Sequence, residues 1–201
     1  MPRFVPLALR LAALTLLPTL LLGEARSQEG TPLAGTPVAV RIEGSETFEV
    51  ASNDHTEGTV DYVQEPPAGG AHHPIWQNCG FYEESVRNEH AVHSQEHGAV
   101  WVTYQSSLPA DQQRLLRRLT ERAEYLLVSP YPDLPAPVVA SAWGARIELN
   151  DADDPRLRSF IRTYAGEGPE PGAPCSGGTD ETFPLSAESG GGTPVAATPT
   201  A

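Results

Sequence analysis

The most regular hydrophobic pattern of the chain begins at residue 99. Residues 99–104 are rich in β-branched and aromatic side chains, which favours a buried strand. Ser107-Leu108-Pro109 predicts the start of a helix that continues to about Glu124. Apolar residues recur at helical spacing within it, namely Leu115, Leu116, Leu119 and Ala123. The pattern therefore predicts a strand followed by an amphipathic helix.

Similar signals continue as far as residue 166. Apolar runs at residues 125–128, 138–140 and 145–149 predict further strand pieces. Asp154 followed by Pro155 predicts a helix N-terminus. Its apolar face and its end are given by Leu157, Phe160, Ile161, Tyr164 and Gly166. The second half thus has the order strand–helix–strand–strand–helix, which indicates an α+β fold, a single compact domain with a mixed or antiparallel sheet and two helices in this half.

The pattern before residue 99 is less regular. Residues 38–42 and 47–50 are β-prone, and the turn-like residues 43–46 between them favour a hairpin. Residues 65–67 are expected to be extended, because each proline disfavours the helical conformation in the residue before it. Gly69-Gly70 then predicts a flexible turn that presents the two histidines that follow.

Both ends of the chain differ from the middle. A basic start, an apolar run and small residues at Ala25 and Ser27 are typical of a signal peptide over residues 1–27, cleaved after Ser27. A single N-terminal membrane anchor is the alternative. We expect a linker at residues 28–37, a globular domain at 38–175 and, because Gly, Pro, Ser and Thr dominate there, a disordered tail at 176–201. The protein is therefore expected to be exported.

Composition excludes several kinds of chemistry. The formal net charge is −13, and such a surface repels phosphate backbones, so nucleic acid is not expected as a partner. The chain contains no lysine, which excludes a pyridoxal phosphate (PLP) Schiff base and a phosphate-loop lysine. No dinucleotide fingerprint is present, so no nucleotide cofactor is expected either. The only methionine is Met1, which excludes a thioether-rich copper(I) site.

Cys79 and Cys175 are the only cysteines. Export would place them in an oxidising compartment, where a disulfide is the expected state. Such a bridge would stabilise the fold by about 4–5 kcal/mol in the chain-entropy description. The alternative is that Cys79 binds a metal, because it lies among histidines.

Five of the six histidines lie between residues 72 and 97. His93 and His97 are four residues apart, so their rings share a face in a helix and in a strand alike. Neutral imidazole is a common ligand of zinc and copper(II), and loops could add His72 and His55 to the same ion. The alternative is that the histidines only order loops through hydrogen bonds.

Glu96 lies between His93 and His97 in an H-x-x-E-H arrangement, which also occurs in inverted zinc peptidases. There the glutamate activates a metal-bound water, so Glu96 is a candidate general base as well as a candidate ligand or outer partner of the metal. The peptidase motif needs a long helix, however, and here Gly98 and a predicted strand follow at once.

A wider set of residues resembles a bacterial family catalogued as domain of unknown function 3105. The matching positions are Asp54-His55 before Val60-Asp61-Tyr62, Pro66-Pro67 with Gly70-Ala71-His72, Trp76 with Cys79-Gly80-Phe81-Tyr82, Val92-His93 with Glu96-His97-Gly98, Ala142-Trp143-Gly144 and Cys175. The chain departs from the family pattern at Gly69 and Gln95, where serine and leucine are usual, and neither change removes a candidate ligand. The resemblance implies an exported or membrane-attached protein and supplies no established activity.

These observations lead to three hypotheses. The first is a binding module for a divalent transition metal, zinc or copper, held by His93, His97, His72 and His55. The second is a metal-dependent hydrolase with Glu96 as the general base. The third is a structural or partner-binding extracytoplasmic domain without a metal. Each makes a different prediction about how these side chains meet in space.

Overall fold

The computed structural model describes residues 41–184. The predicted signal peptide at residues 1–27, the linker at 28–37 and the first residues of the predicted domain lie outside the described residues, as does the predicted tail after residue 184.

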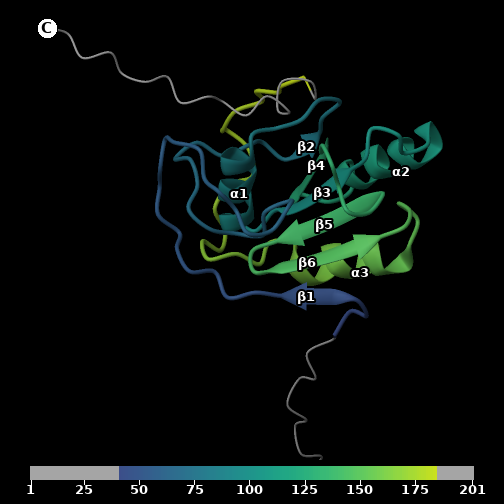
Figure 1. The fold of residues 1–201 in the computed structure, drawn as a ribbon, viewed down its shortest axis with the longest axis horizontal. Coiled ribbons are helices and arrows are strands. Elements are labelled where there is room, and N and C mark those ends of the chain that lie inside the picture. The colour runs from purple at the N-terminus through teal and green to yellow at the C-terminus, as the bar shows by residue number, and fades with distance from the viewer. Residues whose placement is uncertain (1–40, 185–201) are drawn as a thin grey trace, which may run out of the picture. The chain divides into compact units, whose positions relative to one another are not determined.

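Within residues 41–184 the chain forms one six-stranded sheet, which Figure 1 shows face on. Its strand order is β1-β6-β5-β3-β4-β2. The strands are β1 (Ser45–Thr47), β2 (Gly80–Phe81), β3 (Val100–Tyr104), β4 (Leu126–Pro130), β5 (Val138–Ala142) and β6 (Ala145–Leu149). β4 runs parallel to β3 and to β2, whereas the other neighbouring pairs are antiparallel. The sheet is mixed, which confirms the predicted α+β class.

The described residues contain three helices: α1 (Asn88–Glu96), α2 (Ala110–Thr120) and α3 (Pro155–Tyr164). α3 begins as predicted, because the Asp154 carboxylate accepts a hydrogen bond from the backbone N–H of Arg156 at 2.8 Å. α2 ends earlier than predicted, at Thr120, where the chain turns toward β4. None of the three is long and apolar enough to cross a membrane.

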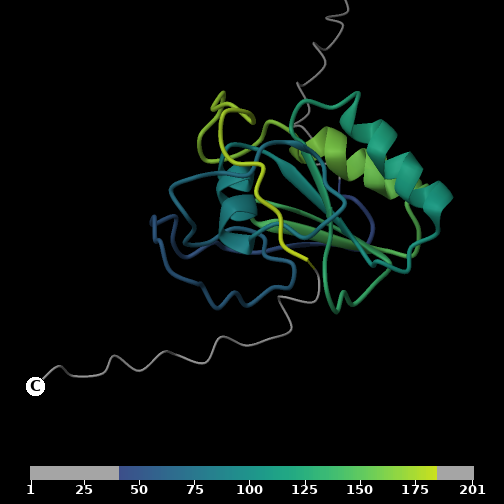
Figure 2. The ribbon, with the colours of Figure 1, turned by 90° about the horizontal axis from the view of Figure 1, so that it is seen from above.

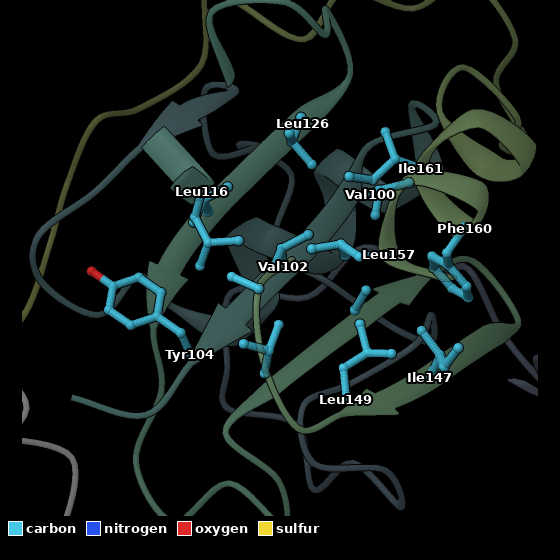
Figure 3. Packing of buried hydrophobic residues seen from close by; sticks show 14 of the residues in the cluster. Val100, Val102, Tyr104, Leu116, Leu126, Ile147, Leu149, Leu157, Phe160 and Ile161 are labelled. Atoms are coloured by element: carbon cyan, nitrogen blue, oxygen red, sulfur yellow. The ribbon is translucent and has the colours of Figure 1, made fainter. Parts of the chain in front are cut away.

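The helices cover the two faces of the sheet. Side chains alternate between the faces of a strand, and Val100 and Val102 of β3 point toward α2 and α3, where the larger core lies (Figure 3). Trp101 points the other way and packs in a second cluster with Ala91 of α1. Figure 2 shows α1 on the side of the sheet opposite α2 and α3. β3 is therefore buried on both faces, which explains its continuous apolar sequence.

α1 is a helix beyond the two that the pattern predicts. The sequence leaves residues 93–97 open between helix and strand, and the structure makes residues 88–96 helical. Every residue from Glu89 to Glu96 is buried, although most of them are polar. Loops cover the sides of α1 that the sheet does not, so the helix carries no one-sided apolar stripe from which it could be predicted.

The predicted hairpin at residues 38–50 does not form in the described part of that segment. Residues 45–47, predicted to lie mainly in the turn, are themselves the strand β1, and they pair antiparallel with β6, Ser45 opposite Ile147. A tight turn precedes them, in which Gly44 has φ +78° and Ser45 N–H donates to the carbonyl of Ile42. An isolated two-stranded hairpin is only marginally stable, whereas pairing with β6 extends an existing sheet.

The chain beyond Cys175 lies along the loop that precedes α1. Asn78 N–H donates to the carbonyl of Thr179 at 2.9 Å, and Phe183 N–H donates to that of Ser85 at 2.8 Å. The sequence predicts disorder from residue 176, and these bonds hold the first part of that segment, as far as residue 184, against the domain.

Candidate metal centre

The last turn of α1 carries the central part of the site. His93 and Glu96 are three residues apart in the helix, so they lie on one face, and His97 follows as the residue that ends the helix. All three side chains are buried. The helical conformation therefore brings Glu96 next to His93, an arrangement that a strand would not have produced.

A loop before α1 supplies two more imidazoles. His72 N–H donates to the carbonyl of Asp54 at 3.0 Å, and Thr56 N–H donates to the carbonyl of His72 at 2.7 Å. This short parallel bridge holds His55 beside His72, with ring centroids 4.9 Å apart. His72 is buried, whereas 52% of the His55 side chain is exposed.

These side chains converge. His55, His72, His93 and Glu96 each offer a ligand atom, and the four atoms all lie within 4.8 Å of one another. His72 Nε2 is 3.0 Å and His55 Nε2 is 4.0 Å from Glu96 Oε2. Two nitrogens bound to one tetrahedral zinc ion at about 2.1 Å lie about 3.4 Å apart, so small rotations would bring the four atoms to ligand distances.

Hydrogen bonds orient the buried rings. His72 Nδ1 lies 2.8 Å from the carbonyl oxygen of Gly70, and His93 Nδ1 lies 2.6 Å from that of His73. A carbonyl only accepts, so each Nδ1 carries a proton and donates, which leaves Nε2 as the atom of each ring that can bind a metal. Rings that bind metals in proteins are oriented by bonds of this kind.

The charges around the ring nitrogens also suit a cation. Burial lowers the pKa of His93 to about 4, against a bond to the His73 carbonyl that raises it, and the neighbouring histidines lower it further. His93 is therefore neutral at pH 7, with its lone pair available. His72 Nε2 is buried, has no hydrogen-bond partner among the described residues and faces a carboxylate oxygen of Glu96. A cation between these two atoms would satisfy both.

Asn53 completes the surroundings of Glu96. Its amide Nδ2 donates to Glu96 Oε1 at 3.2 Å, while Oε2 faces the histidines. Sequence reasoning missed Asn53, because it lies 43 residues from Glu96 and no spacing rule connects them. The carbonyls that orient His72 and His93 were missed for the same reason.

The remaining histidines lie beside this group or apart from it. His97 Nε2 is 3.0 Å from His93 Nε2, but His97 is outside the group of four converging residues. Of the four predicted ligands, the structure thus brings together His55, His72 and His93, with Glu96 in the fourth place. His73 and His90 form a separate pair whose ring centroids are 4.6 Å apart.

Cys79 and Cys175 form a disulfide across 96 residues of sequence, as expected. The bond removes Cys79 from the candidate ligands. It is also typical of proteins that work in an oxidising compartment outside the cytoplasm. Cys79 N–H donates to the carbonyl of Cys175 at 2.8 Å, which ties the segment after α3 to the loop before α1.

Comparison with known families agrees with the resemblance seen in the sequence. Residues 54–177 match the family described as "Protein of unknown function (DUF3105)". This chain belongs to that family. The DUF3105 region includes every residue of the candidate centre except Asn53, and both cysteines. No curated protein matches the chain, and no solved structure matches it either.

Proposed function

We propose that this DUF3105 protein binds one divalent transition metal ion, zinc or copper(II), through His55, His72, His93 and Glu96. The observation that carries the proposal is the convergence of these four ligand atoms within 4.8 Å. Residues from two separate segments, 53–73 and 93–96, meet there through backbone and side-chain hydrogen bonds. The metal is the expected partner, and no nucleotide or nucleic acid is.

The kinds of ligand atom support this class of metal. Three imidazoles and one carboxylate match the nitrogen and oxygen ligands of zinc and copper(II), whereas calcium and magnesium prefer sites built of oxygen alone. The buried part of the site, His72, His93 and Glu96, excludes water from most of the ion. His55, which is half exposed, leaves one side open to solvent.

Binding is favoured over catalysis by the surroundings of Glu96. Its carboxylate is buried, with Oε1 bonded to Asn53 and Oε2 directed at His72. Both oxygens are thus engaged within the group of ligands, rather than directed at a cleft where a general base would meet a substrate. A metal-dependent hydrolase is the second candidate, and it predicts turnover that is lost on Glu96→Gln while the metal stays bound.

We propose that the protein acts outside the cytoplasm. The disulfide and the signal-like residues 1–27 support export, with cleavage after Ser27 or with the N-terminus kept as an anchor. A periplasmic or cell-surface metal-binding protein fits both arrangements.

Elemental analysis of the purified protein, dialysed against zinc or copper(II), tests the proposal. We expect one metal ion per chain in the wild type, and a loss of at least tenfold in affinity for His72→Gln and His93→Gln. The matched control is His73→Asn, because His73 lies in the same segment and its side chain contacts none of the four ligands in the structure. Circular dichroism establishes that each variant is folded. Metal-free wild-type protein, or equal binding by His93→Gln and His73→Asn, would leave only a structural or partner-binding domain.

A further inference from the structure

His97 is oriented like the ligands of the proposed centre, although it is not one of them. Its Nδ1 lies 2.8 Å from the carbonyl oxygen of Pro174 and donates to it, and its Nε2 is directed at His93. The ring is buried and packs against Trp76, with centroids 4.9 Å apart. The group of four ligands does not include this nitrogen, although a hydrogen bond of the same kind holds its ring in a fixed direction.

The Nε2 atom of His97 lies between the buried centre and an exposed carboxylate. On one side, His93 Nε2 is 3.0 Å away. On the other side, Glu170 Oε2 is 3.6 Å away, and 55% of the Glu170 side chain is exposed. Both rings donate from Nδ1, so the hydrogen bond between the two Nε2 atoms needs a proton on one of them, and a metal cation beside these nitrogens can take the place of that proton.

We infer that His97 and Glu170 form a second, weaker position for the same metal ion, through which the ion passes between solvent and the buried centre. The inference rests on the proposed function. His93 is shared: it binds the ion in the buried centre and receives it from His97. One ion thus has two alternative positions, and the chain binds one equivalent of metal.

The shared nitrogen limits the protein to one ion. His93 Nδ1 donates to the His73 carbonyl, so only Nε2 can bind a metal, and one lone pair binds one ion at a time. Only His97 and Glu170 belong to the outer position alone, because His93 is shared with the centre. The outer position therefore binds the ion more weakly than a centre with four ligands. Weak binding at the outer position lets the ion leave it again, either to solvent or to the buried centre.

The segment after α3 holds the outer position in place. Glu170 N–H donates to the carbonyl of Glu96 at 3.1 Å, and Pro174, which orients His97, precedes the disulfide-bonded Cys175. Glu170 is therefore fixed to the end of α1, next to His97, although it belongs to a distant segment.

Stopped-flow measurements on full-length protein test the inference. Zinc uptake is followed after mixing, and zinc release is followed with an excess of a chromophoric chelator. We expect Glu170→Gln and His97→Gln to slow both uptake and release by roughly tenfold, while the Kd for zinc changes by less than about twofold. Glu170→Asp, which keeps the charge, should restore much of the rate. The matched control Glu167→Gln removes the same charge from an exposed position in the same segment and should have no effect.

The outcomes separate the inference from the proposed function. Equal rates for Glu170→Gln, Glu167→Gln and the wild type would mean that the ion exchanges past the exposed His55, and the outer position would be rejected while the centre stands. A Kd raised tenfold by His97→Gln would make His97 a ligand of the centre itself and would also reject it. Two equivalents of zinc per wild-type chain would contradict the shared nitrogen. A wild type without stoichiometric metal would remove both proposals.

Discussion

Residues of one type have different surroundings in this protein, and the histidines illustrate it. His72, His93 and His97 each donate from Nδ1 to a backbone carbonyl. The Nε2 of His72 faces Glu96, and the Nε2 atoms of His93 and His97 face each other. His73 instead accepts a hydrogen bond at Nδ1 from Ile75 N–H at 3.0 Å, so its Nε2 carries the proton. His90 is buried, and neither of its ring nitrogens has a hydrogen-bond partner among the described residues. The chemistry of each imidazole therefore follows from its neighbours and not from its place in the sequence.

His90 predicts how stability depends on pH. Burial lowers its pKa to about 4, and the nearby His73 and Arg87 lower it further, while Glu181 and Glu89 oppose them. In the unfolded chain the pKa of histidine is about 6.5, so between pH 6.5 and 4 the unfolded state binds a proton that the folded state does not. The free energy of unfolding should then be level above pH 6.5 and fall as the pH drops toward 4.

Urea denaturation at several pH values, with a chelator present, measures this dependence. His90→Leu should make the decline between pH 6.5 and 4 shallower, because the buried group that titrates is removed. Each protein is compared with its own value at pH 7.5, so a change in overall stability does not affect the result. An equally steep decline in both proteins would show that His90 does not carry this effect; His93, whose pKa is also lowered to about 4, would be the remaining candidate.

At the scale of elements, α1 is a helix of mainly polar residues that is buried on all sides. Burying a polar group costs free energy unless it is hydrogen-bonded, and bonds from Gln95 and Ser94 offset part of this cost. Gln95 Nε2 donates to the carbonyl of Pro67 at 3.0 Å and to Ser141 Oγ at 2.8 Å, and Ser94 Oγ donates to the carbonyl of Gln77 at 2.6 Å. These bonds connect α1 to the loop before it and to β5. A helix held from several sides keeps its histidines in fixed directions, which a metal centre requires.

The close contact between α1 and the segment after α3 can be tested at Gly168. A Cβ atom there would lie 2.6 Å from Gly98 N and closer still to the carbonyl oxygen of Glu96, both backbone atoms. Gly168→Ala should therefore lower the free energy of unfolding by about 1–3 kcal/mol, as overpacking does. Urea denaturation measures the change.

Gly58→Ala is the matched control. A Cβ at Gly58 would lie 3.6 Å from the nearest atom, Thr56 Oγ1, which is an ordinary contact. Its effect should stay within about 0.5 kcal/mol. If the two variants were equally stable, the segment after α3 would not be held against α1 in solution as it is in the structure.

At the scale of the whole described domain, α1 is enclosed by chain segments far apart in sequence. The loop at residues 50–79 precedes it, and residues 166–183 follow the last helix and return to the same place. The disulfide between Cys79 and Cys175 joins these two segments. The centre and its outer position thus depend on contacts between two segments that are far apart in the sequence.

Reduction of the disulfide tests how much the link between these two segments contributes to stability. The bond spans 96 residues, so its loss should lower the free energy of unfolding by about 2–5 kcal/mol. Denaturation with and without a phosphine reductant measures the difference. The double variant Cys79→Ser/Cys175→Ser should be as unstable as the reduced protein and should not respond to the reductant. A wild type that is equally stable in both conditions would mean that the hydrogen bonds between the two segments suffice.

Much of the sheet could be predicted because β3, β4 and β5 are buried on both faces. β3 and the helix N-terminus at Asp154 have local signals, namely a continuous apolar run and a capping residue followed by proline. β1 and α1 have none, since β1 depends on the distant strand β6 and α1 is covered by loops. Local patterns report local preferences, and these two elements form through contacts that are distant in sequence.

The sequence by itself indicated the class of fold, the disulfide partners and the segment in which to look for chemistry, because residue types and short-range periodicity are enough for each. Its resemblance to a known family gave the family. Only the tertiary structure decided which of the histidines meet, because the direction of an imidazole depends on carbonyls and side chains that lie many residues away. That is how Glu96 and Asn53 came to join His55, His72 and His93, and how His97 came to lie next to them, toward Glu170.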